Sequence, residues 1–115
     1  MLPIIGGELK RSLLRIALKR VPNEAVGIIY NDQAYELRND SETPDHHFEF
    51  EVKDLRLLIM SLEVPILEVN EEVALWHSHP EGGVGPSRFD MQNRTPLKHH
   101  LVIALVDGDI VPTWY

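Results

Sequence analysis

The chain has 115 residues, of which 43% are hydrophobic and 25% charged, and its formal net charge is -7. This length suits one ordinary domain, and the acidic balance disfavours nucleic acid and anionic membrane surfaces as partners. The chain has no cysteine and no apolar run near the roughly 20 residues that span a bilayer, so we expect no disulfide and no thiolate zinc site, and a cytoplasmic location.

The N-terminal half predicts a helix followed by a β-hairpin. Apolar residues recur at three- and four-residue spacing in "ELKRSLLRIALKR", which predicts an amphipathic helix that ends near Pro22. The runs "AVGIIY" and "AYELR" flank the turn "NDQ" and predict a hairpin from about Ala25 to Arg38. A polar loop, "NDSETPD", comes next, and the alternating run "HHFEFEV" after it predicts a short or edge strand.

The C-terminal half predicts two more helices and three strands. The run "KDLRLLIMSLE" has helical periodicity, and Pro65 ends this helix. In "EEVALWHSH" two acidic residues precede an apolar run that predicts a strand. The loop "PEGGVGP" precedes a short helix that starts at Ser87, and "HHLVIALV" and "IVPTWY" flank the turn "DGD" as a second hairpin. The order α-β-β-(β)-α-β-α-β-β predicts an α/β fold in which residues 1–115 form a single three-layer domain, a mixed sheet flanked by helices.

The end of the predicted "ALWHSH" strand has the spacing of a metal site. Side chains alternate along a strand, so His77 and His79 face one way and Ser78 the other, with Cα atoms of the two histidines about 7 Å apart. Two imidazoles at that separation can converge on one cation, and neutral imidazole is a common zinc ligand. If the loop folds back, Asp90 can supply a third, oxygen ligand, which leaves the fourth position open as in catalytic zinc sites.

Each of these residues also has a structural interpretation. An H-x-H pair in a strand can be two half-buried histidines, and Ser87 with Asp90 fits the S-x-x-D pattern of a helix capping box. Glu24, just before an apolar strand, suits a general base but is also an ordinary position for a solvated carboxylate. The adjacent pairs "HH" at residues 46–47 and 99–100 cannot chelate in this way, so we expect surface or structural roles for them.

Taken together, Glu24, "HSHP", the seven residues 80–86 and "SRFD" resemble the JAMM motif E…H-x-H-x7-S-x2-D of the MPN-type (JAB domain) zinc metalloproteases. The leading helix and the "P-x-E-x-x-G" entry to the first strand extend the resemblance to most of the chain. The resemblance implies a cytidine deaminase-like α/β/α fold, one zinc ion, and hydrolysis of peptide or isopeptide bonds by a zinc-activated water.

The resemblance also implies a role for each motif residue. His77, His79 and Asp90 look like the zinc ligands, Glu24 like the acid/base, and Ser87 like the donor to the oxyanion. The chain resembles compact prokaryotic and phage members, including the N-terminal domain of phage tail assembly protein K, which implies a protein or peptide substrate and makes tail assembly one candidate setting. Processing of a ubiquitin-like or sulfur-carrier protein and a non-catalytic MPN scaffold are the alternatives.

Overall fold

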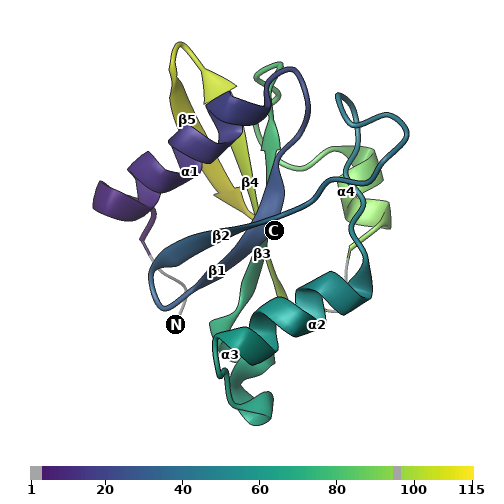
Figure 1. Cartoon of the computed structure of the whole chain (residues 1–115). Coiled ribbons are helices and arrows are strands. Elements are labelled where there is room, and N and C mark those ends of the chain that lie inside the picture. The colour runs from purple at the N-terminus through teal and green to yellow at the C-terminus, as the bar shows by residue number, and fades with distance from the viewer. Residues whose placement is uncertain (1–3, 95–96) are drawn as a thin grey trace.

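A computed structural model describes residues 4–94 and 97–115 of the protein, which form a mixed five-stranded sheet with helices on both faces (Figure 1). The strand order is β2-β1-β3-β4-β5, in which β3 and β4 run parallel and every other neighbouring pair is antiparallel. The elements in chain order are α1 (Gly7–Arg20), β1 (Val26–Tyr30), β2 (Gln33–Leu37), α2 (Val52–Ser61), η1 (Ile66–Glu68), α3 (Val69–Glu72), β3 (Ala74–His79), α4 (Arg88–Gln92), β4 (His99–Val106) and β5 (Asp109–Trp114).

The two faces of the sheet carry separate hydrophobic cores. On one face α1 packs through Leu9, Leu13 and Ala17 against a cluster that includes Trp76. On the other face Leu55 of α2 joins a cluster that includes Leu75. Trp76 and Leu75 are neighbours on β3 and serve opposite cores, so β3 is buried on both sides. The predicted three-layer α/β arrangement is confirmed.

Both hairpins have tight two-residue turns. Asn31 and Asp32 join β1 to β2 with positive φ angles of 51° and 63°, and Asp107 and Gly108 join β4 to β5 with φ of 51° and 79°. Positive φ at both central residues matches the right-handed twist of the paired strands, and Asn, Asp and Gly adopt it most readily. The turn residues therefore account for the two hairpins that the sequence predicts.

Gly27 allows the strands around β1 to approach closely. A Cβ atom at this position would lie 1.9 Å from the Tyr35 carbonyl oxygen and 2.8 Å from Nε1 of Trp76, which donates a hydrogen bond to the Ile28 carbonyl. No side chain fits there, so the glycine of the "P-x-E-x-x-G" sequence is required by packing. The close approach keeps β1, and with it the preceding Glu24, fixed against β3.

Two expectations need correction. The run "HHFEFEV" forms no strand among the described residues, and residues 47–51 are irregular. The segment is instead held by Asn39, whose side chain accepts from the backbone N–H of Glu49 and donates to the carbonyl of His47. Phe48 and Phe50, which alternate with polar residues in the sequence, still point the same way: their rings lie parallel with centroids 6.5 Å apart.

The second correction concerns the region around Pro65. Helix α2 already ends at Ser61, and η1 and α3, which the sequence did not predict, follow Pro65. They lie beyond α2 at one end of the molecule (Figure 1). Among the described residues, no helix combines the length and the apolar character that a membrane span requires.

Candidate metal centre

Strand β3 delivers two imidazoles to the face of the sheet that α2 covers. His77 and His79 lie on the same face as Leu75. His77 is fully buried, and the side chain of His79 is 13% exposed. Ser78 points to the other face, where its Oγ accepts a 2.8 Å hydrogen bond from the buried N–H of Ala25. The strand therefore holds the two histidines and, through Ser78, also fixes the residue that follows Glu24.

Helix α4 brings Asp90 to the two histidines. Ser87 caps this helix: its Oγ accepts from the N–H of Asp90 at 3.0 Å, and its own N–H donates to Oδ2 of Asp90 at 2.9 Å. This reciprocal capping box fixes the rotamer of Asp90, whose side chain is 4% exposed. Oδ2 of Asp90 lies 3.1 Å from Nε2 of His77 and 3.0 Å from Nε2 of His79.

These three atoms form a nearly equilateral triangle, because the two Nε2 atoms are themselves 3.2 Å apart. An ion with tetrahedral ligands at the roughly 2.0–2.1 Å of zinc–nitrogen and zinc–oxygen bonds has ligand atoms about 3.3 Å apart. The triangle of His77, His79 and Asp90 therefore has the size of one face of a tetrahedral zinc site. Two imidazoles and a carboxylate are also a suitable donor set for zinc.

Each histidine also has an outer contact at its second ring nitrogen, Nδ1. Nδ1 of His79 lies 2.8 Å from the carbonyl oxygen of Gly83, which can only accept, so the ring hydrogen is on Nδ1. Nδ1 of His77 faces the Tyr115 hydroxyl at 3.4 Å. His79 therefore presents its Nε2 lone pair to a metal, whereas the Tyr115 hydroxyl, which can donate or accept, orients the His77 ring without fixing its tautomer.

The acid–base properties of the three residues follow from this contact. Burial lowers the pKa of His77, against the opposing effect of Asp90, and so favours the neutral ring that binds metals. Burial also acts to lower the pKa of His79, but Asp90, the Gly83 carbonyl and Glu24 outweigh it and raise this pKa. Burial acts to raise the pKa of Asp90, yet the two histidines and the N–H of Ser87 hold it well below its usual range. Asp90 is therefore ionised in the folded protein.

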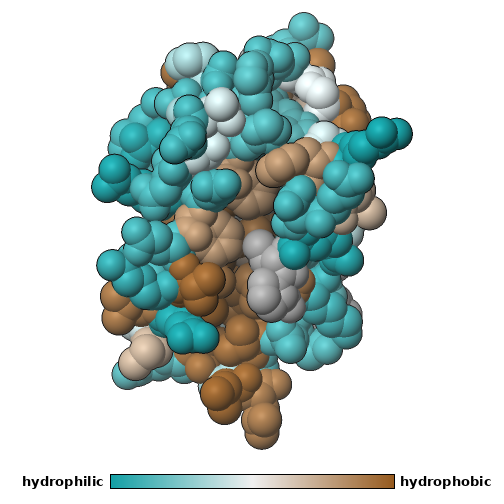
Figure 2. Space-filling model, turned by 90° about the vertical axis from the view of Figure 1, so that its right-hand side faces the viewer, coloured by the Kyte–Doolittle hydropathy of each residue, from teal (hydrophilic) through white to brown (hydrophobic). Residues whose placement is uncertain are grey.

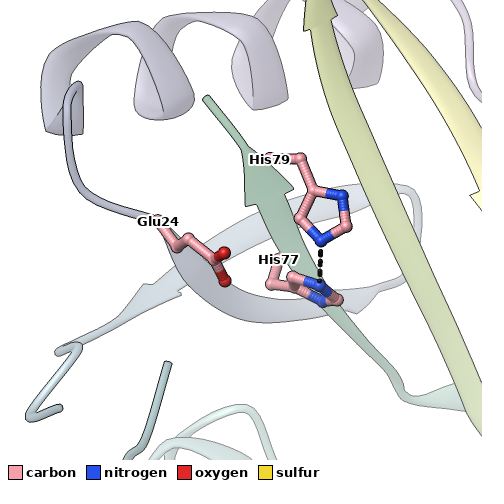
Figure 3. A group of neighbouring side chains, drawn as sticks. All are labelled: Glu24, His77 and His79. Carbon is pink, nitrogen blue, oxygen red and sulfur yellow. Dashed lines mark hydrogen bonds between the residues drawn. The ribbon is translucent and has the colours of Figure 1, made fainter. Parts of the chain in front are cut away.

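Glu24 approaches the two histidines from the segment that precedes β1 (Figure 3). Its backbone is held on both sides, because its N–H donates to the Pro44 carbonyl at 2.7 Å and its carbonyl accepts from the Asn39 side chain at 2.9 Å. The residue is 6% exposed, and its buried Oε1 has no hydrogen-bond partner among the described residues. Burial raises the pKa of Glu24 to about 8, with Asp90 and Asp45 adding to the rise against the charge of His79.

Glu24 also offers an alternative ligand set. One carboxylate oxygen of Glu24 and one nitrogen each of His77 and His79 lie within 4.8 Å of one another, close enough to hold a metal after small movements. One Asp90 oxygen lies 3.1 Å from Nε2 of His77 and 3.0 Å from Nε2 of His79. Both carboxylates are therefore candidate ligands, and the sequence-based prediction assigns the third ligand to Asp90 and the acid/base role to Glu24.

The structure places Ser87 at the edge of this site rather than inside it. The side chain is exposed, and its observed contact is the cap of α4. Because Oγ accepts from Asp90, the hydroxyl hydrogen is still available to donate to another group. The capping alternative is therefore present in the structure, and the oxyanion role of Ser87 stays a prediction.

Four contacts of the site were not foreseen from the sequence. The Phe48 ring lies against His77, with centroids 4.5 Å apart and planes 31° apart, and Tyr115, Gly83 and Asn39 hold His77, His79 and Glu24 as described above. Phe48, Tyr115 and Asn39 are distant in sequence from the residues they contact, and Gly83 contributes a backbone carbonyl. In the sequence only Asn39 gave a signal, because Asn in a polar loop often hydrogen-bonds to nearby backbone groups.

The other histidine pairs do not join the triangle. His100 is buried and its Nε2 lies 2.8 Å from the Leu97 carbonyl, while His47 packs on the Phe89 ring with centroids 4.0 Å apart. His46 is exposed beside Asp45. These surroundings are compatible with the structural and surface roles that the sequence predicts for them.

Comparisons with known proteins agree with this architecture. The family model for prokaryotic homologues of the JAB domain matches residues 7–114, and the JAB domain family includes hydrolases. The solution structure of protein DSY2949 from Desulfitobacterium hafniense is similar, with 26% sequence identity and a TM-score of 0.61 over 90% of this chain and 76% of that one. A search of curated proteins gave no significant match. Since the family match spans nearly the whole described structure, the chain belongs to the prokaryotic homologues of the JAB domain.

Proposed function

We propose that the protein is a zinc-dependent hydrolase of peptide or isopeptide bonds. The observation that carries this proposal is the triangle of His77 Nε2, His79 Nε2 and Asp90 Oδ2, with separations of 3.0 to 3.2 Å. In the proposal these three atoms hold one zinc ion per chain. When bound, zinc supplies Lewis-acid chemistry, since it polarises a carbonyl and lowers the pKa of a water molecule.

Glu24 is proposed as the group that moves the proton. Its buried Oε1 has no partner among the described residues, which suits an oxygen that receives a hydrogen bond from a water or a substrate. In the proposed reaction Glu24 takes a proton from the attacking water and later gives it to the leaving amine, so the carboxylate is regenerated. A pKa raised by burial is typical of carboxylates that exchange protons near neutral pH.

Two further residues are proposed to assist. The free hydrogen of the Ser87 hydroxyl donates to the oxyanion that forms as water adds to the carbonyl. Asn39 acts as a positioning residue. Its side-chain amide donates a hydrogen bond to the backbone carbonyl of Glu24 and so fixes the backbone from which the Glu24 side chain extends. The natural substrate stays a prediction from the resemblance: a polypeptide of a phage tail, or a ubiquitin-like or sulfur-carrier protein.

The test uses zinc-loaded protein, a peptide library from a digested bacterial proteome, and a ubiquitin-like protein extended beyond its C-terminal Gly-Gly. New N-termini are read by mass spectrometry. We expect cleavage that a chelator abolishes, that added zinc restores, and that Glu24→Gln loses. If the zinc-loaded protein cleaves nothing while it binds these same proteins, the scaffold alternative is correct.

A further inference from the structure

A large apolar cavity lies directly beside the proposed metal site. It has a volume of about 610 Å³ and lies between α2, α3, α4 and the segment around Phe48. Its apolar wall includes Phe48, Phe50, Leu55, Ile59, Val69 and Leu97. Figure 2 shows apolar atoms lining a hollow in this face, framed by hydrophilic side chains.

The cavity shares two residues with the metal site. Asp90 lines the cavity and also contacts both histidines, and Phe48 lines it while its ring lies 4.5 Å from that of His77. A group held in the cavity therefore lies next to the bond that the metal site would cleave. Nothing in the proposed reaction itself needs an apolar wall at this point.

The size and chemistry of the cavity define its occupant. Its volume falls within the roughly 300–1,000 Å³ of pockets that bind drug-sized molecules, so it has room for more than one large side chain. Its charged lining residues are Glu49, Arg56 and Asp90, which give no excess of positive charge for a phosphate or a carboxylate. An uncharged, apolar occupant fits this wall best.

We infer that this cavity is a specificity pocket that takes large apolar side chains, aromatic or branched, of a polypeptide substrate next to its scissile bond. The inference rests on the proposed hydrolase function and adds the class of substrate. A polypeptide is the favoured occupant because the metal site that shares Asp90 and Phe48 with the cavity is proposed to act on peptide bonds. A second copy of the chain, inserting its exposed Ile66 and Leu67, is the competing occupant.

Binding is measured first, separately from cleavage. The probes are two acetylated and amidated peptides, Gly-Gly-Leu-Phe-Gly-Gly and Gly-Gly-Ser-Asn-Gly-Gly, titrated into zinc-loaded Glu24→Gln protein by methyl NMR. We expect the Leu-Phe peptide to bind at least about tenfold more tightly and to shift the methyl signals of Leu55, Ile59 and Val69. Equal affinities, or shifts at Ile66 and Leu67 alone, would overturn the inference.

Two variants and a control keep this result interpretable. Ile59→Gln makes the wall polar, and Asn70→Trp blocks the rim from an exposed position, so at least one should fold normally. Each should lower the preference for the Leu-Phe peptide about tenfold. Leu57→Gln is the matched control, because Leu57 lies on the same helix, is 61% exposed and does not line the cavity.

The cleavage sites in the peptide library then separate the two claims. We expect large apolar residues to be enriched next to the scissile bond, and Asn70→Trp to remove this enrichment. Cleavage without that enrichment would reject the pocket and keep the hydrolase, whereas selective binding without any cleavage would reject the hydrolase and keep the pocket. A pocket variant that converts a dimer to a monomer without changing peptide affinity would show that a second copy is the occupant.

Discussion

Nε2 of His79 lies 3.0 Å from Oδ2 of Asp90, while Nδ1 of the same ring faces the carbonyl oxygen of Gly83 at 2.8 Å. With its hydrogen on Nδ1, a neutral His79 presents a lone pair to an ionised carboxylate. That contact is repulsive unless a cation lies between the two atoms. The cation is either a proton, which makes His79 an imidazolium, or a metal ion, so protons and metal compete for one position.

This competition predicts that zinc affinity falls as the pH falls. The pKa of His79 is raised, so the metal-free protein holds this proton up to a higher pH than an ordinary histidine does. Below that pKa zinc must displace one proton, and its apparent affinity should weaken by up to about tenfold for each unit of pH. Competition with a chromophoric chelator, corrected for the chelator's own protonation, measures the slope; a flat profile would show that His79 is not a ligand.

Removal of zinc should lower the stability without unfolding the chain. Both hydrophobic cores are built without the metal site, from α1 on one face and α2 on the other. With zinc at a hundredfold excess over its dissociation constant, the bound ion adds about 2.7 kcal/mol, which corresponds to a melting temperature higher by roughly 10 °C. Calorimetry with and without chelator checks this; loss of the far-UV circular dichroism signal on chelation would identify a structural metal.

Glu24→Gln should separate proton transfer from folding. The amide keeps the size of the side chain but cannot accept a proton, so turnover should fall by roughly 10²–10⁴. Because burial raises the pKa of Glu24 to about 8, the metal-free variant should be more stable than wild type by a margin that grows from about pH 4.5 and levels off above about pH 8. The sign follows because the folded state resists the ionisation that the unfolded chain undergoes near pH 4.5. A variant with wild-type turnover would remove Glu24 from the reaction.

Ser87→Ala distinguishes the two roles left open for this residue. Loss of the observed cap should cost about 1 kcal/mol of stability, because the N–H of Asp90 loses its acceptor. If the hydroxyl also serves the oxyanion, turnover should fall by roughly 10²–10³ as well. Melting temperature and rate are measured on one preparation, and Ser87→Thr, which keeps the hydroxyl, is the control. A less stable variant with near-normal turnover would make Ser87 a cap alone.

The elements that could be predicted are those whose local sequence signals, periodicity and turn residues, favour the same structure that packing favours. The helix α1 and the two hairpins carry their own periodicity and turn residues, so their order and approximate bounds could be predicted. The strand expected around Phe48 did not form, because its alternation reflects two rings packed on one side of a segment that Asn39 holds in place of a neighbouring strand. Alternation alone cannot distinguish these cases.

The candidate site could be predicted in its residues but not in its surroundings. The spacing of His77 and His79 on one strand and the capping box of Ser87 and Asp90 are local features. The Tyr115 hydroxyl and the apolar wall beside Asp90 depend on how distant segments pack, and the Gly83 contact is made by a backbone carbonyl that no side-chain pattern marks. These surroundings orient the histidines and shape the pocket.

The most direct test of the metal site compares two isosteric changes, Asp90→Asn and Glu24→Gln, by zinc content. After loading and desalting, we expect about one zinc per chain in wild type and in Glu24→Gln, and loss of most of the zinc in Asp90→Asn. His77→Ala is the second ligand control and should lose zinc like Asp90→Asn. Zinc retained in Asp90→Asn but lost in Glu24→Gln would contradict the proposed ligand set and make Glu24 the third ligand.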